Sequence, residues 1–206
     1  MKGLTRAPAW FQTFSSVGYV AVSFFFILSG FILIYTYAGK PLNVRQFWRA
    51  RLARLYPVYL VSLALTAPFF FYGVLKMSLP YLWYFQARPA STVVLVLTML
   101  QAWVPMAALG WNSPAWVSVE IFFYILFPLL LARFERIPNR GLAAIALAGW
   151  MLAVATAISY VVLRPDRVEA NSSTDFLFWL SALKFFPLMR LPEFIVGLTC
   201  GYWHGL

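Results

Sequence analysis

One acidic residue, Glu120, is the first candidate for chemistry in this sequence. It interrupts an otherwise uncharged run of membrane length, and a carboxylate at membrane depth usually faces a partner or a polar cavity. Ser113, Trp116, Glu120 and Tyr124 recur at the spacing of one helix face. This pattern predicts a polar groove for a substrate, or a structural ion pair with an arginine of another helix, and the residues favour the two equally.

A basic cluster supplies the second candidate site. No charge falls between Arg6 and Lys40, and five basic residues then follow within one short segment, ending at Arg54. Arg51 and Arg54 lie three residues apart and would share a face of a helix. Their planar guanidinium groups suit a phosphate-bearing substrate such as a coenzyme A thioester. Composition alone favours the alternative, a positively charged loop against anionic lipid.

The remaining reactive side chains point to structural roles. His204 is the only histidine and stands beside Trp203 at an expected membrane interface. Ser29 lies in an apolar run, where serine most often bonds to its own helix backbone. Cys200 is the only cysteine, so a disulfide framework and a cysteine metal site are excluded, and no metal site is predicted.

The elements that must position these residues are membrane helices. The chain is 63% hydrophobic and 11% charged, against about 25% charged residues in ordinary soluble domains. Its uncharged runs, Leu55–Leu75, Pro89–Val119 and Gly141–Leu163, are each long enough to cross a bilayer. We therefore expect an all-α fold, a polytopic transmembrane helix bundle of about 6–8 membrane segments in one domain, residues 1–206.

The net charge of +10 would suggest nucleic acid as the partner of a soluble protein. Here cytoplasmic loops that follow the positive-inside rule explain it, so we exclude nucleic-acid binding and expect membrane lipids as partners. The same rule predicts that Val17–Ala38 crosses with its N-terminus outside. A chain that begins outside leads us to expect an upstream helix that this sequence lacks.

Further along the chain, Pro57 is expected to open the second membrane helix. Ser91–Val104 is short for a crossing and is expected to be re-entrant or tilted. Phe176–Met189 reads as a further short segment, and Arg190–Glu193 as the start of a last helix. In that helix Gly197 and the glycine four residues later permit close packing.

Four stretches together resemble the acyltransferase-3 family of integral-membrane O-acyltransferases, of the polysaccharide or lipopolysaccharide O-acetylase type. Phe24–Phe31 is similar to the family's FF-x-LSGF helix, and Trp48–Tyr59 to its RxxR and P-x-Y segment. Ser113–Pro128 resembles the family's SPxWSLSVEExFYLLFP. Arg190–Phe194 resembles its R-x-PEF segment.

The resemblance implies a multi-pass protein of the bacterial inner (plasma) membrane that binds no cofactor. It would transfer an acyl group, in the first place acetyl, from acyl-CoA to a hydroxyl of a cell-surface polysaccharide or lipid-linked sugar. Glu120 is the expected catalytic residue. The expected substrate-binding residues are Arg49, Arg51, Arg54, Trp116, Ser118, Tyr124, Arg190 and Glu193.

Two departures from the family pattern affect the functional prediction. The family carries a histidine, regarded as the catalytic base, in a first helix, whereas no histidine precedes His204 here. The pattern also has a second glutamate where this chain has Ile121. We therefore expect a chain that lacks the family's first and last helices. The alternative is a catalytically inactive protein of the same fold that acts as a transporter or assembly subunit.

Overall fold

The computed structural model describes residues 18–76, 83–108, 111, 115–163 and 173–205. Helices account for nearly all of these residues, and none of them lies in a strand, which confirms the all-α prediction. The elements are α2 (Gly18–Tyr37), α3 (Val44–Lys76), α4 (Trp83–Ala87), α5 (Pro89–Leu97), η3 (Gln101–Trp103), α6 (Pro105–Ala108), α7 (Ala115–Phe134), α8 (Asn139–Leu163), α9 (Ser173–Phe185) and α10 (Pro187–Gly205).

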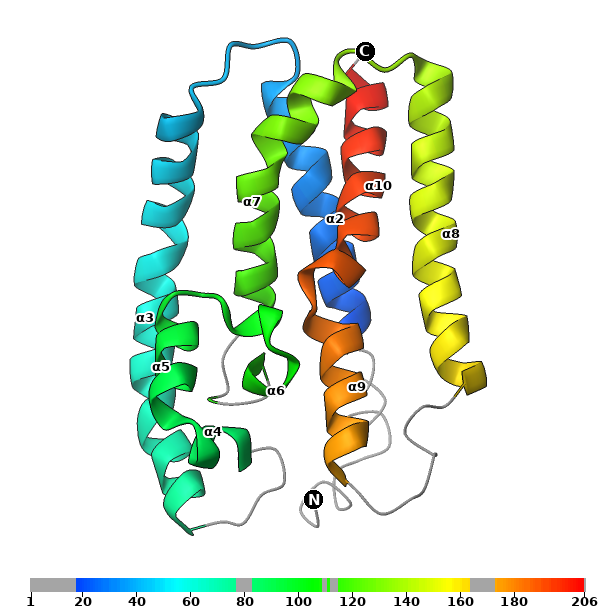
Figure 1. Cartoon of the computed structure of the whole chain (residues 1–206). Coiled ribbons are helices and arrows are strands. Elements are labelled where there is room, and N and C mark those ends of the chain that lie inside the picture. Colours follow the sequence, from blue (N-terminus) through cyan, green and yellow to red (C-terminus); the bar gives the residue numbers. More distant parts are fainter. Residues whose placement is uncertain (1–17, 77–82, 109–110, 112–114, 164–172, 206) are drawn as a thin grey trace, which may run out of the picture.

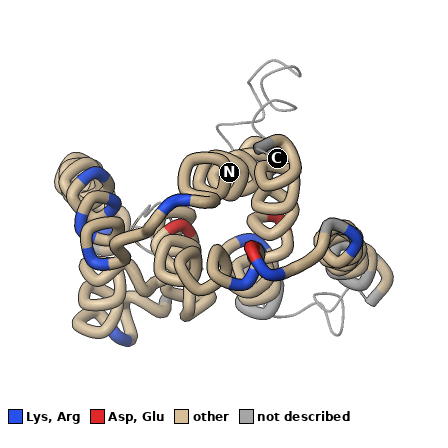
Figure 2. Tube along the Cα trace, turned by 90° about the horizontal axis from the view of Figure 1, so that it is seen from above, with Lys and Arg blue, Asp and Glu red and all other residues tan. Residues whose placement is uncertain are grey.

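The long helices run side by side as an up-and-down bundle (Figure 1). The ends of α2 and α7 meet the starts of α3 and α8 at the top of this view, which we call the basic end. Figure 2 looks down on it and shows basic positions over α3 and at the corner between α7 and α8. The basic residues in and beside these connections are Lys40, Arg45, Arg133, Arg136 and Arg140. The positive-inside rule predicts that this end faces the cytoplasm.

Two helices satisfy both the length and the hydropathy expected of a membrane span among the described residues. They are Val44–Val74 and Ala115–Phe134, and Ala21–Tyr37 and Arg140–Ala155 are shorter apolar helices. This agrees with a membrane bundle.

The structure corrects the expected start of the second long helix. α3 begins at Val44 and continues through Pro57 and Pro68, so the basic cluster, apart from Lys40, lies on a helix and not in a loop. A proline removes one backbone hydrogen bond, but membrane helices accept this where neighbours or water satisfy the freed carbonyl. The apolar run after Pro57 therefore marked only the lower part of a longer helix.

The segment of α4 to α6 does not cross the bundle. These short helices all lie at the end opposite the basic end (Figure 1), and α5 ends at Leu97, which confirms the expectation for Ser91–Val104. The segment is tied to its neighbours through buried hydrogen bonds, since the Tyr59 hydroxyl donates to the Val96 carbonyl at 2.7 Å.

The helices α9 and α10 form one broken rod. They stack end to end and run in the same direction (Figure 1), and α10 begins at Pro187, three residues before the expected start at Arg190. Phe176–Met189 is therefore not a crossing separate from α10.

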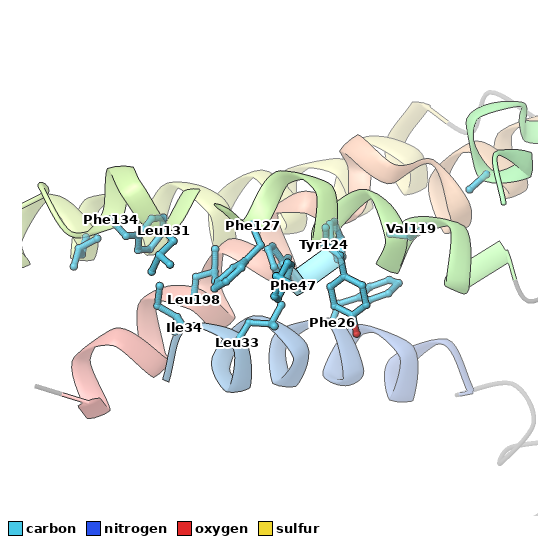
Figure 3. Close-up of a cluster of buried hydrophobic side chains, with 14 residues drawn as sticks. Phe26, Leu33, Ile34, Phe47, Val119, Tyr124, Phe127, Leu131, Phe134 and Leu198 are labelled. Atoms are coloured by element: carbon cyan, nitrogen blue, oxygen red, sulfur yellow. The ribbon is translucent and has the colours of Figure 1, made fainter. Parts of the chain in front are cut away.

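The core lies between α2, α7 and α10, and α3 adds to it (Figure 3). Its α2 and α10 pack so closely that glycine is required at the contact. A Cβ on Gly30 would collide with the Phe194 carbonyl oxygen, and one on Gly197 with that of Ile27. The close packing expected from the glycines of the last helix is thus confirmed. The buried core side chains that Figure 3 labels are Phe26, Leu33, Ile34, Phe47, Val119, Tyr124, Phe127, Leu131, Phe134 and Leu198.

Candidate functional site

Helix α7 places Glu120 and Tyr124 on one side, a turn apart. Both side chains are buried, and Glu120 is only 6% exposed. The Tyr124 hydroxyl donates a hydrogen bond to Glu120 Oε1. Residues four apart stack on a helix, so α7 itself supplies this contact, and Ser29 of α2 is hydrogen-bonded to the same Tyr124 side chain.

A cavity of about 320 Å³ brings the two predicted groups together. Arg51 and Arg54 of α3 line it, as do Glu120 and Tyr124 of α7. We call it the arginine–glutamate cavity. Its apolar walls come from α2 and α3, and its lining residues in full are Phe25, Leu28, Ser29, Ile32, Leu33, Arg51, Arg54, Leu55, Glu120 and Tyr124.

Arg51 is held by aromatic rings and not by an acid. Its guanidinium carbon lies 5.4 Å from the ring centre of Phe47 and 5.4 Å from that of Tyr124. Trp48 joins the two helices beside it, because its indole N–H donates to the Tyr124 carbonyl at 3.0 Å. A cation over aromatic faces is oriented but keeps its hydrogen-bond donors for a ligand.

The structural alternative for Glu120, a direct ion pair across helices, is not formed in the part of the chain that the structure describes, although Arg51 and Arg54 of α3 attract the carboxylate at longer range. Among the described residues, no arginine or lysine nitrogen lies within 4.0 Å of its carboxylate, and Arg190 and Glu193 form the ion pair that does occur. The Glu120 carboxylate therefore shares a cavity with two arginines to which it is not directly bonded. Such an arrangement can hold an anionic ligand next to a hydrogen-bond acceptor.

A second polar cluster lies on α10, at its contact with α2 and α7. Arg190 Nη1 pairs with Glu193 Oε1 at 2.7 Å, and the Ser23 hydroxyl donates to the same oxygen at 2.9 Å. The Arg190 guanidinium lies 5.9 Å from the Trp116 ring centre, and its Nε donates to the Lys184 carbonyl at 2.9 Å. None of these residues lines the arginine–glutamate cavity. The last contact ties α9 to α10, which is a structural role.

The other predicted site residues are also apart from the cavity. Arg49 is exposed on α3 and does not line it. Ser118 is buried, and its hydroxyl oxygen accepts the Ala102 N–H at 3.3 Å, which ties η3 to α7. Ser113 falls outside the described residues. Substrate binding by Arg49, Ser118, Trp116, Arg190 and Glu193 stays a prediction, and only Arg51, Arg54, Glu120 and Tyr124 converge.

Sequence reasoning missed Ser29 as a member of the site. It lines the arginine–glutamate cavity from α2, and the signal available was its place in the LSGF stretch. His204 lies elsewhere, with ring centres 5.9 Å from Phe31 and 5.8 Å from Tyr35. Within the described residues, no three His, Cys, Asp or Glu side chains gather as metal ligands.

Comparison with known proteins extends over almost the whole chain. A profile of the acyltransferase-3 family, described as an acyltransferase domain, matches residues 2–206. The chain belongs to the acyltransferase-3 family. This family is one of membrane-embedded acyltransferases, and the acyltransferase-3 chain described here has the apolar helices that such an embedding requires.

Two relatives of this acyltransferase-3 chain cover different shares of it. The protein named acyltransferase MdmB of Streptomyces mycarofaciens is 33% identical over 208 residues, or 93% of this chain and 49% of that protein. Protein 2 in the picA locus of Rhizobium radiobacter is 41% identical over 69 residues, or 32% of this chain and 36% of that protein. The chain thus spans about half the length of the first relative. No solved structure matches it.

Proposed function

We propose that this chain belongs to a membrane O-acyltransferase that moves an acyl group from acyl-CoA to a hydroxyl of a cell-surface polysaccharide or lipid-linked sugar, in the bacterial inner membrane. The arginine–glutamate cavity carries the proposal, because it joins two guanidinium groups to a buried carboxylate. The acceptor and the donor rest on the family resemblance. Acetyl is the first expectation for the acyl group.

Arg51 and Arg54 are suited to the donor's phosphates. A guanidinium group presents paired donors that match phosphate oxygens, and both arginines lie on the part of α3 nearest the basic end (Figure 1). If that end faces the cytoplasm, the cationic side of the cavity faces the compartment that supplies acyl-CoA. The thioester would then enter the cavity ahead of the nucleotide.

Glu120 is suited to the acceptor hydroxyl. In the transfer, the hydroxyl oxygen forms a bond to the thioester carbonyl carbon, the carbon–sulfur bond breaks, and the hydroxyl proton ends on the coenzyme A sulfur. A carboxylate that already accepts one hydrogen bond from Tyr124 has a second oxygen with which to accept one from the acceptor. We assign Glu120 the positioning of that hydroxyl and the removal of its proton.

Coenzyme A binding by the purified chain in lipid nanodiscs tests the donor site. We expect Arg54→Ala to weaken binding about 10- to 100-fold, as for the loss of a hydrogen bond between charged groups. The matched control is Arg45→Ala, which removes an exposed arginine of the same helix that does not line the cavity. Equal weakening by both changes would show general attraction to a basic surface and would refute the assignment.

A further inference from the structure

A second hollow lies between α3 and α7, beside the arginine–glutamate cavity. Its volume is about 350 Å³, at the lower end of the range of about 300–1000 Å³ for ligand pockets. We call it the side groove. Its lining residues are Trp48, Arg51, Leu52, Ile121, Tyr124 and Ile125.

The two hollows share a wall. Arg51 and Tyr124 line both of them, so a ligand held by Arg51 in the cavity has the side groove within its immediate reach. The other lining residues of the two hollows differ. Arg54 and Glu120 also line the cavity, whereas the remaining lining of the side groove is apolar. A molecule that fits both would have a polar part and an apolar part joined at this wall.

The two helices are held together where the groove lies. Trp48 lines it, and its indole bonds to the Tyr124 backbone. Leu52 and Ile125, which also line it, are 45% and 57% exposed, so the groove opens sideways from the bundle. An apolar chain bound in the groove could therefore extend toward lipid. The groove thus sets no sharp upper limit on the length of that chain.

Ile121 is one of the apolar residues that line the side groove. It follows Glu120 directly, and about 100° of helical rotation carries its side chain from the cavity side of α7 to the groove side. This position differs from the family pattern, which has a second glutamate where this chain has isoleucine. A glutamate would place a charge among apolar side chains, whereas isoleucine leaves the groove suited to hydrocarbon.

We propose that the side groove binds the hydrocarbon chain of the donor, so that the protein takes acyl groups longer than the acetyl group that the family resemblance first suggests. The inference rests on the proposed function, because it requires a donor whose phosphates lie at Arg51 and Arg54. The thioester lies at the shared wall, and the acyl chain turns away from Glu120 into the groove. Acetyl, with no chain beyond its methyl group, leaves the groove empty.

Binding of a donor series to the full chain in nanodiscs tests the proposal. The probes are coenzyme A and its acetyl, butanoyl, hexanoyl and octanoyl thioesters. We expect affinity relative to coenzyme A to rise with chain length, by up to about fourfold for each added methylene group. Ile125→Trp, which fills the groove, should remove most of this rise, and Leu52→Trp should do the same from α3.

The control variant is Leu129→Trp, which adds the same indole to an exposed site on α7, one turn beyond Ile125. This variant should keep the rise of affinity with acyl chain length. Comparison with it corrects for partition of long thioesters into the lipid. The proposal is overturned if the wild-type protein shows no rise, or if all the variants show the same rise as wild type. The second result would mean that the groove holds a membrane lipid tail or nothing.

Failure of the proposed function gives a different result. If neither coenzyme A nor any thioester binds in a way that depends on Arg54, the donor site does not exist and the inference falls with it. If coenzyme A binding depends on Arg54 but chain length has no effect, the donor site stands and only the groove assignment is wrong.

Discussion

Glu120 accepts a hydrogen bond from the Tyr124 hydroxyl. No arginine or lysine of the described residues forms a direct ion pair with it. A buried carboxylate kept in this state is costly, so a role beyond packing is expected. Glu120→Gln preserves the shape of the side chain and removes its charge. We expect acyl transfer to fall by about 100-fold or more, the usual contribution of a positioned acid–base group.

The measurement is acyl transfer by membranes that contain the variant, compared with coenzyme A binding by the same protein. Binding should change much less than transfer, because Glu120 lies apart from the phosphate contacts in our assignment. A Glu120→Gln variant with wild-type transfer would remove Glu120 from the mechanism.

Tyr124→Phe separates orientation of the carboxylate from the carboxylate itself. It removes the hydroxyl that donates to Glu120 Oε1 but keeps the ring beside Arg51. We expect about a tenfold loss of transfer, as for one hydrogen bond to a charged group. Loss as large as that of Glu120→Gln would instead show that the hydroxyl itself contacts the reacting atoms.

At this scale, four of the predicted site residues, Arg51, Arg54, Glu120 and Tyr124, line one cavity, and the others lie apart from it for a geometric reason. A helix turns about 100° per residue, so residues four apart drift by about 40°, and Trp116 and Tyr124 differ by about 80°. Trp116 therefore reaches Arg190 of α10. Ser118, two residues before Glu120, points to the opposite side and meets η3.

Among the elements, the junction of α9 and α10 depends on Arg190. Its side chain is 13% exposed and its partner Glu193 is 14% exposed. Arg190→Met would leave a largely buried carboxylate without its cation, which costs about 3 kcal/mol of stability. We expect the additional change Glu193→Gln to restore most of this loss, as measured by unfolding of the purified protein in detergent.

The double variant is decisive because it distinguishes charge from packing. If it is no more stable than Arg190→Met alone, the guanidinium group contributes through its contacts with Trp116 and the Lys184 carbonyl.

The glycine contact between α2 and α10 supports a second prediction for the elements. Gly197→Leu would force the Ile27 backbone away, and we expect a loss of about 3 kcal/mol, the upper end of the cost of overpacking. Gly149→Ala is the control, since a Cβ there would lie at an ordinary 3.5 Å from the Pro192 carbonyl oxygen. Thermal unfolding should separate the two variants, and similar unfolding temperatures would argue against tight packing at Gly197.

The sequence predicts which segments are helical better than it predicts where these helices begin and end. The end of α7 follows from the charged residues that close its apolar run. The start of α3 does not, because Pro57 is a helix-start signal that the tertiary environment overrides. Nor does the sequence show that α9 continues into α10, since tertiary contacts hold the two in line, among them the hydrogen bond from Arg190 Nε to the Lys184 carbonyl.

For the whole molecule, the positions of the basic residues predict the orientation. In a Cys200→Ser background, Asn43→Cys lies between α2 and α3 at the basic end, and Arg88→Cys lies between α4 and α5 at the other end. A membrane-impermeant thiol reagent applied to intact cells should label only the second. Labelling of Asn43→Cys under these conditions would show that the bundle has the opposite orientation. The arginines would then face the compartment without acyl-CoA.

The pairing of α2 with α10 also governs how the protein is made. The ribosome completes α2 at Tyr37 and reaches Pro187 on the order of ten seconds later, at about 5–20 residues per second. Throughout that interval the glycine-bearing side of α2 lacks α10. We expect the nascent bundle to stay open on this side of α2 until α10 inserts, and chains arrested before that moment to be the preferred substrates of membrane quality-control proteases.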